Sequence, residues 1–230
     1  MNILALDTAT NVMGIAATTD EHRICIQANI GFHHGESLFP WMDRMFRELE
    51  LNPKDLNLVI CTIGPGSFTG LRIGLSTAKG IALAAECPVV GIPTLDLYAA
   101  SHAHLRGLVI PLLDARKNRF YTACYSHGKR TSEYLDLAAA ETAALAGKDD
   151  TVLFTGPDAA VLAPILTEGR ATILPQQADL ELLVSLGIRK LEEDGPLDPA
   201  AGPLYLRRCE AEMHHEEMEA RKKGDPGRVT

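Results

Sequence analysis

The order of apolar segments in residues 1–105 constrains the fold more than any other feature of this sequence. Three short apolar runs are joined by short polar connections, which is typical of antiparallel strands. They are followed by an amphipathic helix at 36–49, and strands and helices then alternate. The expected elements are strands at 3–6, 14–18, 23–30, 58–63 and 89–92, and helices at 36–49, 70–86 and 94–105. This βββαβαβα order predicts an α/β domain.

Residues 106–209 repeat the pattern with weaker signals. The expected strands lie at 108–113, 120–125, 134–137, 152–155 and 172–174, and the helices at 138–146, 158–167 and 180–193. A segment rich in Gly and Pro, 195–203, reads as a linker. The sequence therefore predicts a first lobe at 1–105, a second and smaller lobe at 106–209, and a charged tail at 210–230.

A formal net charge of −8 limits how this chain can bind nucleic acid. A protein that grips a phosphate backbone by itself usually presents a basic face, and no dense cluster of Lys and Arg occurs in the part predicted to fold. Another chain is therefore expected to hold most of any nucleic acid. No apolar run approaches the roughly 18 residues that cross a bilayer. The first seven residues carry no export signal, so we expect a cytoplasmic protein.

Cysteine and histidine spacing gives no metal site. The five cysteines are far apart and form no CxxC pair, which is typical of buried thiols in a reducing compartment. His33 and His34 are followed four residues later by Ser37 and Leu38, so neither begins the i, i+4 pair that binds a metal on one helical face. No GxSxG nucleophile elbow is present. We assign no catalytic and no metal-ligating residue.

The strongest local motif is the glycine-rich segment Gly64–Arg72, which joins a strand to a helix. Glycines and hydroxyls before a helix N-terminus expose backbone N–H groups and favour an anion. A tight turn that needs glycine would use the same residues. The segment matches neither the P-loop nor the dinucleotide fingerprint. Its Ser67 is a candidate cofactor-binding residue.

Two polar turns follow apolar strands in the two halves. Asp7 and Thr8 come directly after the first strand and could face the Mg²⁺-bound water of a nucleotide. A simple hairpin turn explains them as well. Segment 114–119 is expected to be a charged hairpin loop. Its alternative interpretation is a counterpart of the Asp7 turn that faces a cleft between the lobes.

Small residues recur every four positions in the helix after the glycine-rich segment: Gly70, Gly74, Ala78 and Ala82. Glycine inside a helix costs roughly 1 kcal/mol relative to Ala, so a close contact must offset it. Packing within the lobe would provide that contact, and so would a helix of another chain.

Six segments together resemble the TsaB family, the dimerisation subunits of the bacterial machinery that makes threonylcarbamoyladenosine at position 37 of tRNA. The longest and most specific match is the glycine-rich segment, extended to Gly74. All six keep the family's order across roughly residues 3–207. They are Ile3–Thr10, His34–Pro40, Gly64–Gly74, Ala78–Ala82, Leu112–Arg116 and Pro203–Arg207.

The resemblance implies an actin-like ATPase fold, related to hexokinase, Hsp70 and RNase H, with two lobes of which the second is reduced. It also implies a subunit without catalytic residues that binds the paralogous transferase TsaD through first-lobe helices. TsaD carries the metal through an HxxxH pair, which this chain lacks. The partner interface is placed on the small-residue stripe and the preceding long helix, at Leu38, Met42, Gly70, Leu71, Gly74, Ala78 and Ala82.

Further partners follow from the resemblance. A P-loop ATPase, TsaE, joins the assembly, the subunit pairs with itself when TsaD is absent, and tRNA is met only through the complex. No cofactor is expected on this chain alone, and ATP or ADP is left to the assembled complex. Two alternatives stay open: a stand-alone actin-fold enzyme, either metallopeptidase-like or ATP-dependent and kinase-like, and a plain homodimeric binding protein.

Overall fold

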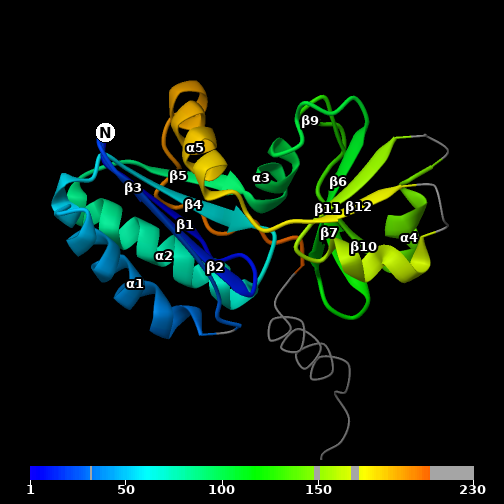
Figure 1. Cartoon of the computed structure of the whole chain (residues 1–230), viewed down its shortest axis with the longest axis horizontal. Coiled ribbons are helices and arrows are strands. Elements are labelled where there is room, and N and C mark those ends of the chain that lie inside the picture. The colour runs from blue at the N-terminus through cyan, green and yellow to red at the C-terminus, as the bar shows by residue number, and fades with distance from the viewer. Residues whose placement is uncertain (32, 148–150, 167–170, 208–230) are drawn as a thin grey trace, which may run out of the picture.

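The first lobe is built on a five-stranded sheet. The computed structural model describes residues 1–31, 33–147, 151–166 and 171–207, which form two lobes side by side (Figure 1). The strand order is β3-β2-β1-β4-β5. The strands are β1 (Ile3–Asp7), β2 (Val12–Thr18), β3 (Arg23–Asn29), β4 (Leu58–Gly64) and β5 (Val89–Pro93). The first three strands are antiparallel and β1, β4 and β5 are parallel, as the predicted meander followed by crossovers requires.

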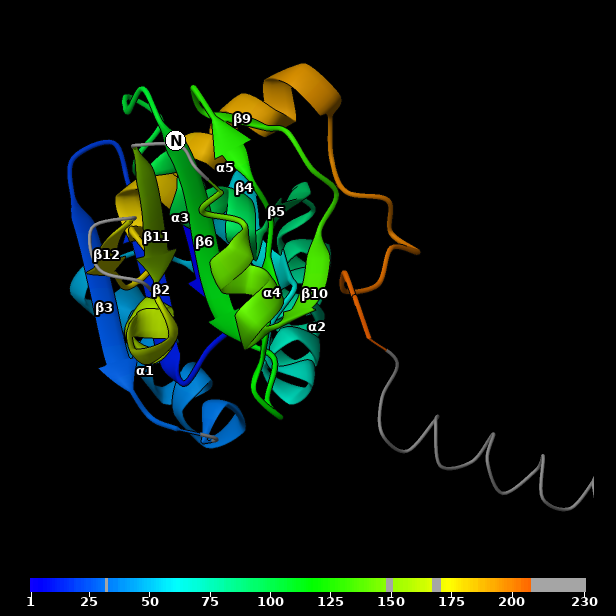
Figure 2. The same ribbon diagram turned by 90° about the vertical axis from the view of Figure 1, so that its right-hand side faces the viewer.

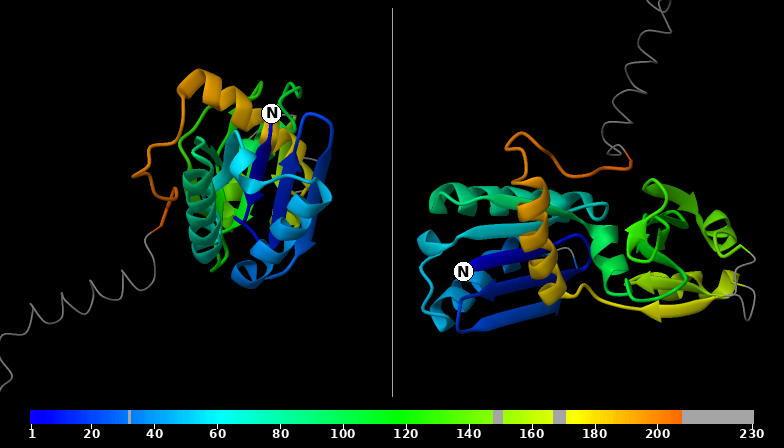
Figure 3. Two further views of the ribbon diagram at one scale, coloured as in Figure 1. Left: turned by 90° about the vertical axis from the view of Figure 1, so that its left-hand side faces the viewer. Right: turned by 90° about the horizontal axis from the view of Figure 1, so that it is seen from above.

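Helices cover both faces of this sheet (Figures 1 and 3). On one face lie α1 (His34–Glu48) and α2 (Phe68–Ala85), whose apolar sides share a core with β1, β2 and β4. On the other face lies α5 (Leu180–Asp194). A short 3-10 turn, Pro53–Asp55, precedes β4 and is capped by Asn52. Helix α3 (Thr94–Ala100) follows β5 and reaches the second lobe, and it is shorter than the expected 94–105.

The second lobe repeats the strand order of the first, β10-β7-β6-β11-β12 (Figure 2). Its main strands are β6 (Leu108–Asp114), β7 (Arg119–Thr122), β10 (Leu135–Ala138), β11 (Val152–Gly156) and β12 (Thr172–Pro175). A small hairpin, β8 (Tyr125–Ser126) and β9 (Lys129–Arg130), extends it. Its helices are short: α4 (Ala139–Ala144) and a 3-10 helix (Ala159–Ile165) in place of the helix expected at 158–167. The duplicated order and the reduced second lobe confirm the actin-like fold.

The predicted lobe boundary at residue 209 is wrong, because the chain returns to the first lobe after β12. Helix α5 packs on β1, β2, β4 and β5, and its Gly187 lies against Ile60 so closely that a Cβ there would be 2.3 Å from the Ile60 side chain. Residues 196–204 then run beside α2 and hydrogen bond to β4 and β5. The apolar side of α5 is buried only by reaching back to the first sheet. The predicted tail at 210–230 lies outside the described residues.

Two smaller expectations also need correction. Helix α1 begins at His34 and not at the expected residue 36. Pro40, which a helix tolerates best in its first turn, therefore lies in the second turn, where it is exposed. Among the described cysteines only Cys61 is buried, whereas Cys87 and Cys124 are half-buried and Cys25 is exposed. Cys25 lies on the edge strand β3, which explains its exposure.

Candidate functional site

A cleft of about 560 Å³ lies between the lobes, within the usual range for a small-molecule site. Loops from both lobes line it at the ends of their central strands. The lining segments are 9–12 after β1, 65–68 before α2, 113–117 after β6, 157–158 after β11, and 204–207 near the end of the described chain. The glycine-rich segment and the turn at 114–117, far apart in the sequence, thus face the same space.

The second-lobe wall of the cleft is a strained charged turn. Arg116, Lys117 and Asn118 have φ values of 62°, 55° and 58°, so three successive residues other than glycine are left-handed. Such a conformation costs roughly 1 kcal/mol or more per residue, and strain of this kind gathers at functional sites. Asp114 supports the turn, since its Oδ1 accepts a hydrogen bond of 2.7 Å from the Arg116 N–H. The segment is thus the charged hairpin loop that was expected, here between β6 and β7, and its residues 114–117 also line the cleft, as in the alternative interpretation.

Asp158 adds a second carboxyl group to the same wall. Its Oδ2 accepts a hydrogen bond of 2.8 Å from the Asp114 N–H. Burial raises the pKa of Asp158, and this outweighs the hydrogen bond, which acts in the opposite direction. The Arg116 guanidinium lies 3.4 Å from Asp114 Oδ2. This wall of the cleft therefore carries both acidic and basic side chains.

Of the three candidate cofactor-binding residues, only Ser67 reaches the cleft. Its Oγ accepts a hydrogen bond of 3.3 Å from Gly70 N–H and so caps α2. Asp7 and Thr8 are buried, each 1% exposed. Asp7 accepts hydrogen bonds from Thr62 Oγ1 at 2.8 Å and from the Ala9 N–H at 3.1 Å, so its carboxyl group is engaged within the lobe.

These positions do not fit the Mg²⁺-nucleotide role considered for Asp7 and Thr8. Asp7 faces Thr62 inside the lobe, and Thr8 Oγ1 donates to the Gly70 carbonyl at 2.8 Å. Neither side chain lines the cleft. In the part of the chain that the structure describes, no group of three or more His, Cys, Asp and Glu side chains is arranged to hold a metal ion. Both residues instead fix β1 against α2 and β4.

The buried Asp7 gives a prediction about pH. Burial raises the pKa of Asp7 above its unfolded value of 3.8, so the folded state holds this proton more tightly than the unfolded state. The charge of Asp7 therefore destabilises the fold increasingly as pH rises from below 3.8 through the folded-state pKa. Asp7→Asn keeps an acceptor oxygen and removes the charge. We expect the variant to unfold at a higher urea concentration than the wild type at neutral pH, with a gain that shrinks toward acid pH.

The control for this measurement is Asp55→Asn, at an exposed position in the 3-10 turn before β4. It should leave the urea midpoint nearly unchanged at both pH values. If Asp7→Asn unfolds at a lower urea concentration than the wild type at neutral pH, or if its stabilisation does not depend on pH, the raised pKa of Asp7 is contradicted.

The predicted partner interface is corrected by the structure, because all seven of its residues are buried inside the first lobe. They are Leu38, Met42, Gly70, Leu71, Gly74, Ala78 and Ala82. A Cβ on Gly70 would lie 2.1 Å from the Thr8 carbonyl oxygen, and one on Gly74 would lie 2.2 Å from Thr8 Oγ1. The glycines thus allow α2 to approach β1. The stripe is a contact within the lobe and not an open surface.

The opposite side of α2 presents another row of residues at the same spacing. Arg72, Ser76, Gly80 and Ala84 are all exposed, and a Cβ on Gly80 would meet nothing within 4 Å. Large apolar side chains are also exposed on the two helices of this side of the lobe: Leu83 of α2 is 82% exposed, and Phe39 of α1 is 57% exposed. We call these six residues the outer helix face. Both stripes of α2 consist mainly of small residues, so spacing alone could not tell them apart.

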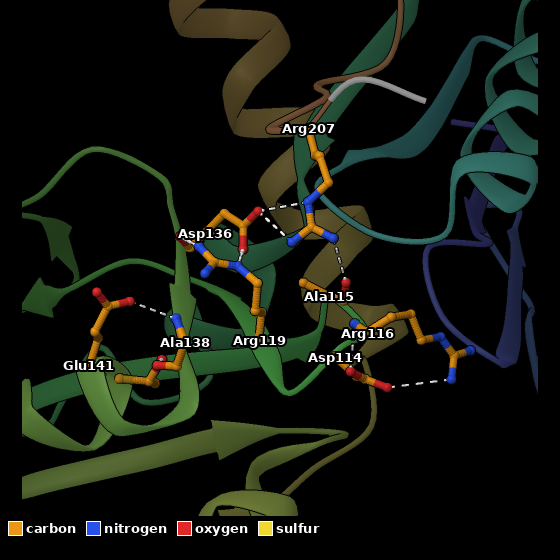
Figure 4. Close-up of polar contacts among 9 residues, drawn as sticks. Asp114, Ala115, Arg116, Arg119, Asp136, Ala138, Glu141 and Arg207 are labelled. Carbon is orange, nitrogen blue, oxygen red and sulfur yellow. Dashed lines mark hydrogen bonds and ion pairs between the residues drawn. The ribbon is translucent and has the colours of Figure 1, made fainter. Parts of the chain in front are cut away.

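The sequence predicted a linker at 195–203, whereas in the structure residues 196–207, here called the C-terminal strap, contact both lobes. Tyr205 stacks on Phe68 of α2, with ring centroids 4.8 Å apart. Arg207 donates to Asp136 Oδ2 from Nε at 2.9 Å and from Nη2 at 2.6 Å, as Figure 4 shows. The match of Pro203–Arg207 to a known family was the one signal that marked this segment.

Known proteins resemble this chain in sequence and in fold. Residues 29–172 match the family model described as "TsaD: tRNA N6-adenosine threonylcarbamoyltransferase". The chain is 31% identical over 164 residues to the tRNA threonylcarbamoyladenosine biosynthesis protein TsaB of Bacillus subtilis, covering 69% of this chain and 72% of that protein. It is 33% identical over 149 residues to the TsaB protein of Escherichia coli, covering 59% of this chain and 62% of that protein, less than two thirds.

The solved structure of YeaZ from Pseudomonas aeruginosa has a TM-score of 0.74 to this chain at 22% identity. The match covers 89% of this chain and 99% of that one, and it supports the fold. Within the described ranges, no helix combines the length and hydrophobicity needed to span a membrane.

Proposed function

Because this chain belongs to the family of tRNA N6-adenosine threonylcarbamoyltransferases, and within it to the relatives named TsaB, we propose that it is a non-catalytic subunit in the synthesis of threonylcarbamoyladenosine on tRNA. It binds a TsaD-type transferase and supports it. The relatives' name gives the pathway, and the absence of a catalytic role for this chain is our own inference. We propose that it acts in the cytoplasm, where tRNA is modified.

The outer helix face carries this proposal. Small residues at Ser76, Gly80 and Ala84 let a second helix approach the backbone of α2 closely, while Leu83 and Phe39 supply apolar area at its edge. Leu83 and Phe39 are large apolar side chains that a docked helix would remove from water, which favours association. A paralogue with the same fold would present an equivalent pair of helices, so four helices would pack together.

The other proposed partners depend on docking at this face. A second copy of this chain is expected to occupy it when the TsaD-type chain is absent. A TsaE-type ATPase and tRNA would then join through the complex, and ATP or ADP would bind there. A net charge of −8 supports the view that other chains hold most of the tRNA.

The interlobe cleft weighs against the alternative of a stand-alone enzyme. Asp7 and Thr8 are turned into the lobe, and Ser67 caps a helix. The carboxyl groups of Asp114 and Asp158 are joined through the Asp114 backbone. This set offers neither an activated nucleophile nor a ligand group for a catalytic metal.

Reconstitution tests the proposal. The purified chain, a TsaD-type chain, and both together would be incubated with TsaE, the threonylcarbamoyl donor, ATP and unmodified tRNA, and modified adenosine would be measured. We expect rapid modification only when both chains are present, and none from this chain with TsaE alone. Modification by this chain without the transferase would contradict the proposal, and so would a failure to increase the activity of the transferase.

A further inference from the structure

The C-terminal strap is held firmly on the first lobe. The Leu197 N–H donates to the Val89 carbonyl, and the Leu204 N–H donates to the Ile63 carbonyl, both at 2.7 Å. Lys79 of α2 donates to two strap carbonyls, at 2.7 and 2.6 Å. These hydrogen bonds from Lys79 and from the strap backbone fix the path of the strap along the side of the first lobe (Figure 3).

The far end of the strap is fixed on the second lobe. The Arg207 guanidinium binds Asp136 of β10, and its Nη1 donates to the Ala115 carbonyl at 3.1 Å (Figure 4). Arg119 donates to the other oxygen of Asp136 at 2.8 Å. The Asp136 side chain is 17% exposed and that of Arg207 is 25% exposed, so water screens this pair less than a surface ion pair. The strap therefore bridges the two lobes across the rim of the cleft.

Between these two anchors, Tyr205 joins the outer helix face to the cleft. The Arg72 Nε donates to the Tyr205 hydroxyl at 2.9 Å, and the Arg72 guanidinium lies 3.9 Å from the centroid of the Phe68 ring. Phe68 and Tyr205 also line the cleft. Arg72 begins the exposed row that continues through Ser76 and Gly80. One cluster of three side chains thus forms both a wall of the cleft and one end of the proposed docking face.

We infer that the strap couples partner docking to the arrangement of the two lobes. A helix of the TsaD-type chain that lies along the outer helix face reaches Arg72 and Tyr205 and stabilises the strap in the position that holds Arg207 on Asp136. Docking on the first lobe then restrains the second lobe and the charged turn at 114–118. This inference rests on the proposed function, because it assumes the partner. Coupling of this kind is reciprocal, so releasing the strap from the second lobe weakens partner binding.

The test compares Arg207→Ala with Arg130→Ala in binding to the purified TsaD-type chain by calorimetry. Both variants remove an arginine of similar exposure that contacts the second lobe; Arg130 lies over the Tyr134 ring. We expect Arg207→Ala to weaken binding about 10-fold, as typical couplings do, and Arg130→Ala to leave it unchanged. Circular dichroism of each variant verifies its fold.

A second measurement uses the wild-type chain and does not depend on a variant that folds. Hydrogen exchange at the Arg116 amide, which lies in the second lobe, should slow when the TsaD-type chain binds. Unchanged exchange at Arg116, or wild-type affinity of folded Arg207→Ala, would overturn the coupling. If Gly80→Arg still weakens binding strongly in that case, the docking proposal survives. If Gly80→Arg also binds normally, the outer helix face is not the docking site, whereas the proposed function itself fails only if the wild-type chain neither binds the TsaD-type chain nor increases its activity.

Discussion

Gly70→Ala is expected to destabilise the chain by about 3 kcal/mol, the upper part of the range for overpacking in a rigid core. A Cβ at this position would lie 2.1 Å from the Thr8 carbonyl oxygen, which belongs to the backbone and cannot rotate away. Thr8 is also held by the bond from its Oγ1 to the Gly70 carbonyl. Relief of the clash requires α2 to move away from β1. Urea denaturation at neutral pH measures the decrease in the free energy of unfolding.

Gly80→Ala is the matched control, since it makes the same substitution in the same helix. A Cβ on Gly80 meets nothing within 4 Å, so only helix propensity changes, and we expect a gain of roughly 0.5–1 kcal/mol. The two alanine substitutions should therefore change the free energy of unfolding in opposite directions. Equal stabilities would mean that α2 does not present its Gly70 side to β1.

Gly80→Arg is expected to weaken binding of the TsaD-type chain about 100-fold, the size of effect seen at the centre of an interface. A long charged side chain in the middle of the exposed row keeps a second helix away from α2 and buries an unpaired charge. The fold should be unaffected, because Gly80 faces solvent. Binding is measured by calorimetry, and the melting temperature is recorded for the same sample.

Ser185→Arg provides the control for this variant. Ser185 is an exposed small residue on α5, on the opposite face of the sheet from α2. The same charge at that position should leave binding unchanged. Normal binding by Gly80→Arg would remove the outer helix face from the proposed interface, whereas equal losses in both variants would indicate an effect of charge alone.

The succession of strands and helices could be read from the sequence because it depends on local patterns. The three antiparallel strands, α1, α2 and α5 occur close to where periodicity predicted them. The glycine-rich segment and the turn at 114–118 were singled out from composition, and the structure brings both to one cleft. These features rest on backbone conformations that nearby residues impose.

Only the tertiary structure decided which side of each element is buried. Helix α2 carries small residues on two sides, and the position of Thr8, far away in the sequence, determines that Gly70 and Gly74 face inward while Gly80 faces outward. The return of α5 to the first sheet and the bridge from Arg207 to Asp136 also join segments distant in the chain. The spacing of small residues predicts that one side of a helix can accept close packing. Which element packs there depends on contacts between segments distant in the sequence, and spacing does not encode those contacts.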